Sequence, residues 1–307
     1  MKKKLAEPSM AIKQEIGLLK PWFLAARPRT LPICLAPIFV GTLLAKGEVA
    51  NINWILAILA FLSVLFIQVG TNLVNDALDF KKGADTQERL GPKRMTQAGL
   101  LSFQQVLKGG LFCFTLALLL GIPLIVAGGW PLALILLFSV ACGYLYTGGP
   151  KPLAYHGLGE PFIFIFYGLV ASPAVFYLQT GFIDAACLIA GIQMGLLAMI
   201  PNAINNLRDI ASDAKVNKFT LAVRFGPTFA RWEITVFSLA PFVVGFAWLL
   251  KGHLLLALLP FAAFPLAVRL VNTIWNTSQG SSFVESFGQS ILLLFLFAFV
   301  LGIACLL

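Results

Sequence analysis

Long apolar stretches recur along the whole chain, and they constrain its fold more than any other feature. Each is close to the ~20 residues that an α-helix needs to cross a bilayer. Hydrophobic residues make up 59% of the 307 residues and charged residues only 11%, too few polar side chains to cover a water-soluble globule of this size. We therefore predict an all-α, polytopic membrane bundle of nine transmembrane helices, at residues 27–46, 53–80, 102–127, 130–147, 158–178, 182–208, 231–250, 253–271 and 286–306.

The first residues differ from the rest of the chain. Residues 1–22 are basic and include an amphipathic stretch from Ile12 to Trp22, which is typical of a helix at the membrane interface. No apolar core with a small-residue cleavage site follows Lys4, so we expect no removable signal peptide. The remaining residues, 23–307, are predicted to form a single transmembrane domain.

The positions of lysine and arginine predict the orientation. With nine spans and the N-terminus in the cytoplasm, every Lys and Arg except Lys46 and Lys251 falls on the cytoplasmic side. We therefore expect an integral protein of a bacterial-type inner (cytoplasmic) membrane, with its C-terminus outside. The net charge of +9 resides in loops between spans, so we expect no nucleic-acid partner.

Two groups of carboxylates follow apolar stretches on the predicted cytoplasmic side. Each group has one asparagine and two aspartates spaced three or four residues apart, so that all three project from one face of a helix. The groups are Asn72, Asp76 and Asp79, and Asn205, Asp209 and Asp213. Two such faces together would make an oxygen-rich, negative site of the kind that suits Mg²⁺. Mg²⁺ commonly binds one or two carboxylates plus substrate phosphates, and neighbouring Lys and Arg suit phosphate oxygens, so we predict a metal-dependent diphosphate site.

Other kinds of site are less well supported. The five cysteines lie far apart in apolar runs and only two histidines occur, so we expect neither a disulfide framework nor a transition-metal site. Structural ion pairing is the alternative for either acidic group alone, and a topological role is the alternative for single cations. A cation-coupled transporter is the alternative from another class, although transporter sites usually lie near the bilayer midplane on broken helices.

The chain resembles the UbiA superfamily of intramembrane prenyltransferases over essentially its whole length. The superfamily has an Asn-Asp-x-x-Asp signature with a further Asp downstream, and a second signature, Asp-x-x-x-Asp. The matching residues are Asn75, Asp76, Asp79 and Asp85, and Asp209 and Asp213. Within the superfamily the chain is most similar to the naphthoate prenyltransferases of menaquinone and phylloquinone synthesis, the MenA group, in stretches 27–32, 75–94, 146–160 and 205–226. Asn217 replaces the glycine usual in the second motif, and asparagine accepts left-handed backbone angles better than most residues.

The resemblance implies a bundle with a central cavity that is capped on the cytoplasmic side and open laterally to the lipid bilayer. It also implies Mg²⁺-dependent transfer of a polyprenyl group from prenyl diphosphate to 1,4-dihydroxy-2-naphthoate, with decarboxylation. Sister enzymes acting on 4-hydroxybenzoate, homogentisate or 1,4-dihydroxy-6-naphthoate are the alternative.

Carried onto this chain, the resemblance implies three sets of site residues. Asp76, Asp79, Asp209 and Asp213 would hold Mg²⁺, with Asp85 assisting; Arg89, Lys93, Arg94, Lys151, Arg208 and Lys218 would bind diphosphate oxygens; and Arg27, Asn72, Tyr146 and Asn205 would position the metal shell or the aromatic acceptor.

Overall fold

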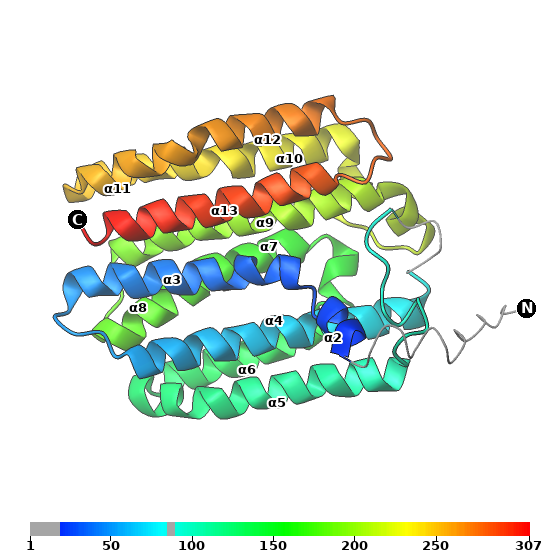
Figure 1. Cartoon of the computed structure of the whole chain (residues 1–307), viewed down its shortest axis with the longest axis horizontal. Coiled ribbons are helices and arrows are strands. Elements are labelled where there is room, and N and C mark those ends of the chain that lie inside the picture. Colours follow the sequence, from blue (N-terminus) through cyan, green and yellow to red (C-terminus); the bar gives the residue numbers. More distant parts are fainter. Residues whose placement is uncertain (1–18, 85–89) are drawn as a thin grey trace, which may run out of the picture.

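Long helices lie side by side along one axis of the molecule (Figure 1). The computed structural model describes residues 19–84 and 90–307, and every regular element in these ranges is a helix. The elements are α2 (Leu19–Ala25), η1 (Pro28–Thr30), α3 (Leu31–Glu48), α4 (Trp54–Lys82), α5 (Phe103–Gly128), α6 (Trp130–Leu145), η2 (Leu153–His156), α7 (Gly159–Ile163), η3 (Phe164–Ala171), α8 (Ser172–Thr180), α9 (Ala185–Lys215), α10 (Leu221–Gly245), η4 (Phe246–Lys251), α11 (Leu254–Leu258), η5 (Leu259–Ala263), α12 (Phe264–Asn276) and α13 (Val284–Ala304).

The predicted all-α membrane fold is confirmed, and each predicted span corresponds to a helix or a run of helices. Eight of these in the described ranges are long and apolar enough to cross a membrane. The remaining one, α6, is apolar but only 16 residues long. The count of nine spans therefore stays a prediction that depends on α6.

Local sequence signals begin and end the two helices that carry the acidic groups. At the start of α4 the Asn53 side chain accepts a hydrogen bond from the Leu56 N–H at 3.2 Å, and Gly83, whose φ of 73° favours glycine, caps the other end after Lys82. At the start of α9 the Asp184 side chain caps the N–H of Cys187 at 3.0 Å. Since α9 continues to Lys215, the whole second acidic group lies on one helix.

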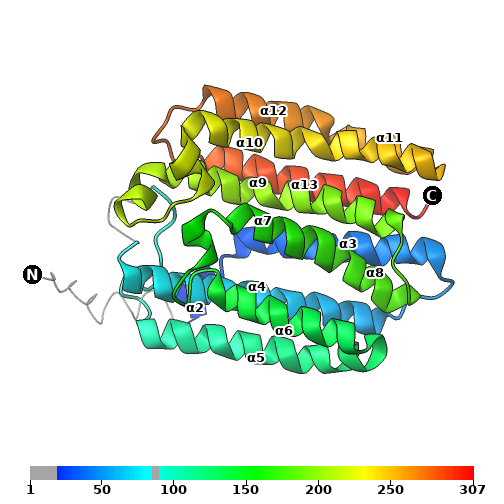
Figure 2. The ribbon, with the colours of Figure 1, turned by 180° about the vertical axis from the view of Figure 1, so that it is seen from behind.

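The helices form two side groups with a middle pair between them. In both views α4, α5 and α6 lie on one side, α9, α10, α12 and α13 on the other, and α3 and α8 in between (Figures 1 and 2). The largest buried cluster is centred on α9, where Leu197, Ile200, Ile204 and Leu207 have no exposed surface. Since lipid tails are as apolar as leucine, close packing rather than exclusion of water holds such helices together.

A π-helical segment, η3, packs closely against α9. A Cβ added to Gly191 of α9 would lie 2.5 Å from the carbonyl oxygen of Gly168 in η3, so only glycine allows this approach. Wide π turns are frequent at functional sites, and η3 contributes Phe166, Tyr167 and Val170 to the wall of the cavity described below.

The seventh predicted span, residues 231–250, lies within the apolar helical run Leu221–Lys251, which comprises α10 and η4. Gly226, with φ 86° and ψ 175°, interrupts the helix just before Pro227. The Gly-Pro pair thus separates residues 221–225 from the longer part of α10, which carries the predicted span.

Candidate functional site

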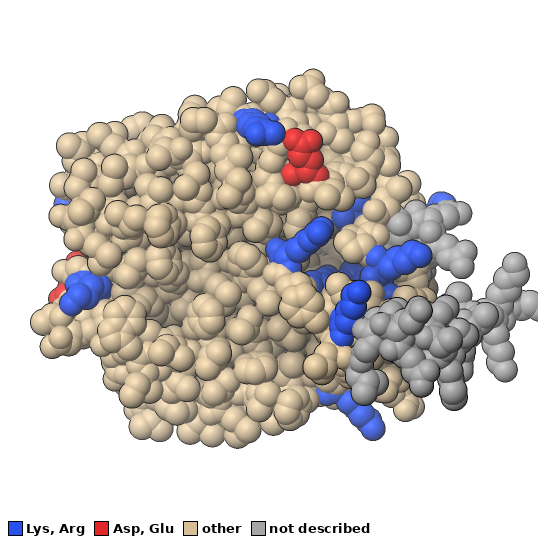
Figure 3. Space-filling model, viewed as in Figure 1, with Lys and Arg blue, Asp and Glu red and all other residues tan. Residues whose placement is uncertain are grey.

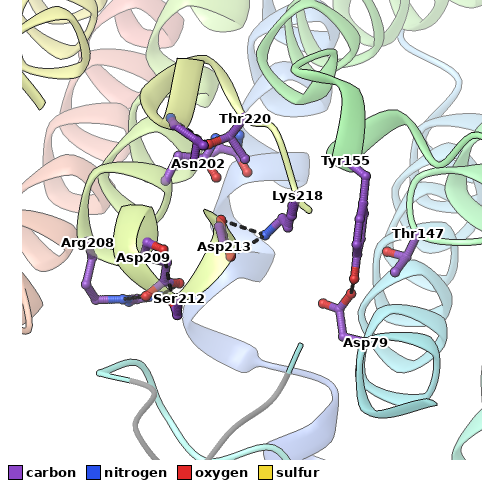
Figure 4. Close-up of polar contacts among 12 residues, drawn as sticks. Asp79, Thr147, Tyr155, Asn202, Arg208, Asp209, Ser212, Asp213, Lys218 and Thr220 are labelled. Atoms are coloured by element: carbon purple, nitrogen blue, oxygen red, sulfur yellow. Dashed lines mark hydrogen bonds and ion pairs between the residues drawn. The ribbon is translucent and has the colours of Figure 1, made fainter. Parts of the chain in front are cut away.

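The carboxylates of α4 and α9 face one another at the same end of the bundle. Asp79 of α4 and Asp209 and Asp213 of α9 surround a space that Lys218, in the loop after α9, enters (Figure 4). The Lys218 ammonium lies 3.1 Å from Asp213 Oδ2. Acids far apart in the sequence thus share one region.

Electrostatics at Lys218 supports this convergence. Burial alone would lower the pKa of Lys218, but the carboxylates of Asp213, Asp79 and Asp209 outweigh burial, and the pKa is raised above its usual value. Two helices therefore direct negative charge at one cationic group.

Asp209 is held by its neighbour in the chain. The Arg208 Nε and Nη2 atoms donate to the two carboxylate oxygens of Asp209 at 2.7 and 2.6 Å. Both side chains are buried. Such a bidentate pair fixes the orientation of the guanidinium group and of the carboxylate group. The same guanidinium geometry also suits phosphate oxygens.

On α4 the two aspartates make different contacts. Asp76, with 1% of its surface exposed, accepts hydrogen bonds from the backbone N–H groups of Met95 and Thr96 at 3.1 and 3.2 Å. Asp79 Oδ1 accepts a hydrogen bond from the Tyr155 hydroxyl at 2.8 Å. Asp76 thus anchors the loop after α4, while Asp79 faces the acids of α9.

Asn75 ties three connecting segments to α4. Its Oδ1 accepts hydrogen bonds from the guanidinium groups of Arg27 and, at 3.0 Å, Arg94, and its Nδ2 donates to Thr147 Oγ1 at 2.8 Å. Lys82 lies 4.4 Å from the centre of the Tyr155 ring, as expected of a cation–π contact. Asn75 belongs to the signature recognised in the sequence, but the sequence did not assign it a role.

Five further predicted residues differ in their surroundings. Asn72 Nδ2 donates to Ala26 O at 2.9 Å and Thr30 Oγ1 at 3.2 Å, and so holds the turn in which Arg27 has a left-handed φ of 54°. Lys93 and Lys151 are exposed. Asp85 and Arg89 lie outside the described residues.

The loop after α9 has the backbone shape that the sequence suggested. Asn217 has a φ of 57°, which confirms that asparagine takes the left-handed conformation here. The next residues reach η2, where the Phe219 N–H donates to Tyr155 O at 3.0 Å. This contact brings Lys218 and Tyr155 to the same region.

A cavity of about 260 Å³ opens beside this junction. Most of its wall is apolar and comes from α3, α4, α5, α6 and the η3–α8 segment. Its polar lining residues include Arg27, Asn72, Asn75, Tyr146, Asn202 and Asn205. Asn72 and Asn205 lie one helical turn before Asp76 and Asp209 on the same faces of α4 and α9, so the polar wall adjoins the acidic residues, an arrangement that suits an apolar chain with a charged head.

The donor chemistry fits Mg²⁺ only when a substrate completes it. Within residues 19–84 and 90–307, no three Asp, Glu, His or Cys side chains are grouped closely enough to hold a metal ion. The groups that converge are carboxylates, and Mg²⁺ commonly takes one or two carboxylates together with substrate phosphates. The residues therefore suit a metal–diphosphate complex better than a metal ion alone.

Basic side chains gather at this end of the molecule. Figure 3 shows Lys and Arg side chains around a hollow on the side where α4 ends (compare Figure 1). Cations around buried acids provide positive charge for an anionic head group.

Similarity to known proteins agrees with this geometry. The model of the UbiA prenyltransferase family matches residues 34–291. The chain is 39% identical over 218 residues to the "1,4-dihydroxy-2-naphthoate octaprenyltransferase" of Haemophilus influenzae, covering 68% of this chain and 70% of that protein. It is 33% identical over 270 residues to the protein of the same name from Mycobacterium tuberculosis, covering 86% and 89%.

A solved structure shares the fold. It is a UbiA homolog from Archaeoglobus fulgidus bound to DMAPP and Mg²⁺, with a TM-score of 0.62 and 18% identity, covering 92% of this chain and 99% of that one. Together with the apolar helices and the family match, this shows an integral membrane enzyme. The chain belongs to the UbiA prenyltransferase family.

Proposed function

We propose that this prenyltransferase moves a polyprenyl group from prenyl diphosphate to 1,4-dihydroxy-2-naphthoate, with loss of carbon dioxide. The observation that carries the proposal is the junction of the α4 and α9 acids beside the polar wall of an apolar cavity. The names of the relatives from Haemophilus influenzae and Mycobacterium tuberculosis support the choice of acceptor.

The cations of the site bind the leaving group. Arg208, Lys218 and Arg94 lie next to the acidic residues and would bind diphosphate oxygens, with Lys93, Lys151 and Arg89 as further candidates. Positive charge fixed in place stabilises the negative charge that develops as the C–O bond breaks. Mg²⁺ held by Asp76, Asp79, Asp209 and Asp213, with Asp85 assisting, would add charge neutralisation at the same oxygens.

The cavity then governs the carbon chemistry. As the allylic C–O bond breaks, its electron pair leaves with the diphosphate, and positive charge develops on the allylic carbon. The electron-rich naphthoate ring forms a new C–C bond to this carbon, and the pair from the broken ring–carboxylate bond restores the aromatic ring as carbon dioxide leaves. The apolar wall keeps water from capturing the allylic carbon, and Arg27, Asn72, Tyr146 and Asn205, which line the cavity, would position the acceptor.

We further propose that the site opens toward the cytoplasm of a bacterial-type inner membrane, with the N-terminus inside and the C-terminus outside. The support is the bias of Lys and Arg toward one end of the bundle, which in membrane proteins marks the cytoplasmic side. This orientation requires that α6 also crosses the membrane.

A panel of acceptors tests the proposed reaction. Purified protein in lipid nanodiscs would receive labelled geranylgeranyl diphosphate and, separately, 1,4-dihydroxy-2-naphthoate, 1,4-dihydroxy-6-naphthoate, 4-hydroxybenzoate or homogentisate. We expect product from 1,4-dihydroxy-2-naphthoate with a preference of about 100-fold or more, a product mass that lacks the carboxyl group, and loss of turnover on adding EDTA. Turnover of 4-hydroxybenzoate without turnover of the naphthoate, or a product that keeps its carboxyl group, would contradict the proposal.

A further inference from the structure

A buried glutamate lies beside the site and has no role in the chemistry described so far. Glu160, in the first turn of α7, has only 2% of its surface exposed. Its Oε1 accepts hydrogen bonds from the side-chain amides of Asn202, at 3.0 Å, and Asn206, both on α9. Its Oε2 is buried and has no hydrogen-bond partner among the described residues. A buried carboxyl group with one orphan oxygen is costly, which favours a functional role.

The direction of the hydrogen bonds is fixed from Glu160 outward. Glu160 Oε1 can only accept, so the amide nitrogen of Asn202 faces it and the amide oxygen of Asn202 faces the other way. That oxygen accepts the hydroxyl hydrogen of Tyr146 at 3.1 Å. Protonation of Glu160 at Oε2 would leave Oε1 an acceptor, so the direction does not depend on the charge of Glu160.

Toward the cavity, the Tyr146 hydroxyl can only accept a hydrogen bond. Its single hydrogen is donated to Asn202, so its oxygen is left to accept a hydrogen bond. Tyr146 and Asn202 both line the cavity. A ligand in the cavity therefore meets, at Tyr146, an oxygen that recognises a donor.

Gly159 leaves room for the hydrogen bond between Tyr146 and Asn202. A Cβ added to Gly159 would lie 3.1 Å from both Asn202 Nδ2 and Tyr146 Oη. A side chain at this position would crowd the hydrogen bond between them, so glycine next to Glu160 is part of the same arrangement.

We propose that Glu160 is a positioning residue for the aromatic acceptor: through Asn202 it turns Tyr146 so that the tyrosine oxygen accepts a hydrogen bond from an aryl hydroxyl of the substrate. The inference rests on the proposed function in requiring a hydroxylated aromatic acceptor. A hydroxyl that donates to Tyr146 gains electron density on its oxygen, which makes the ring more nucleophilic toward the allylic carbon.

Three single variants test the network. Tyr146→Phe and Glu160→Ala should each raise the KM for the acceptor roughly 10- to 100-fold, the cost of an unmade buried hydrogen bond, with little change in the KM for prenyl diphosphate. Glu160→Gln should keep the acceptor KM, because its carbonyl oxygen takes the place of Oε1. The acceptor KM of the double variant Tyr146→Phe/Glu160→Ala should be no higher than that of the more impaired single variant, since both residues act through one chain of hydrogen bonds.

Acceptor analogues supply a readout that a purely structural role would not change. Wild-type protein should favour the dihydroxy acceptor over at least one of 1-hydroxy-2-naphthoate and 4-hydroxy-2-naphthoate, and Tyr146→Phe should lose that preference. Gln193→Leu is the matched control, since Gln193 is a buried polar residue of α9 that bonds to Pro241 O and Trp248 Nε1 away from the cavity. Its acceptor KM should stay at the wild-type value.

Several results would overturn the inference. They are an unchanged acceptor KM in Tyr146→Phe, a Glu160→Gln variant as impaired as Glu160→Ala, and additive losses in the double variant. Wild-type turnover of the naphthoate is measured first, because its absence would refute the proposed function instead. The same variants would then be compared on the hydroxylated acceptor that the panel identifies.

Discussion

Replacing Asp209 by asparagine is expected to lower turnover by about 10³-fold, corresponding to the several kcal/mol that charge stabilisation by a bound metal ion supplies to a transition state. Asparagine keeps the shape of the side chain but removes its charge, so Arg208 loses its bidentate partner and α9 loses one anionic oxygen ligand. The measurement is kcat at saturating prenyl diphosphate and naphthoate, with Mg²⁺ varied.

Asp184→Asn is the matched control for this substitution. Asp184 caps the other end of α9, where it accepts a hydrogen bond from the Cys187 N–H, and asparagine caps a helix about as well as aspartate. We expect wild-type turnover from this variant. Equal losses in Asp184→Asn and Asp209→Asn, or full turnover in Asp209→Asn, would show that the charge at Asp209 has no special role.

Removing the ammonium group of Lys218 is expected to raise the KM for prenyl diphosphate roughly 10- to 100-fold, the range for hydrogen bonds to charged groups. In Lys218→Met the acids of α4 and α9 lose the cation that lies among them, and the diphosphate loses one ligand. Lys218→Arg keeps the charge and should recover much of the affinity. The pKa of Lys218 is raised above the ordinary lysine value of about 10.4, so the ammonium group stays charged at neutral pH. Its contribution to binding should therefore fall only at a pH above that ordinary value.

Lys108→Met is the control for the lysine variant, because Lys108 is exposed on α5. Its KM for prenyl diphosphate should match that of the wild type. Thermal unfolding in the same nanodiscs separates binding from folding, since an unpaired buried Asp213 also destabilises the protein. A lower melting temperature of Lys218→Met with no change in the KM for prenyl diphosphate would leave Lys218 as a structural residue only.

The spans and the acidic helix faces could be predicted because both are properties of short segments. An apolar stretch of about 20 residues and a spacing of three or four residues need no knowledge of the rest of the chain. The spacing placed Asp76 and Asp79 on one face of α4, and both side chains are buried in the structure.

The partners of these residues could not be predicted, because they come from distant parts of the chain. Tyr155 bonds to Asp79, 76 positions earlier, and Glu160 bonds to Asn202, 42 positions later. No periodicity connects such positions. A signal was present only in the resemblance, since Tyr155 and Glu160 fall in the stretch 146–160 that matches the MenA group.

The central claim is that one metal–diphosphate complex is bound by the acids of both α4 and α9. Crystals grown with Mn²⁺ in place of Mg²⁺ and an unreactive prenyl thiodiphosphate would locate the metal by its anomalous scattering. The account predicts Mn²⁺ in contact with the diphosphate and with carboxylates of both helices, including Asp79 from α4 and Asp209 or Asp213 from α9. Mn²⁺ bound by one helix alone, or a diphosphate at the opposite end of the bundle, would contradict it.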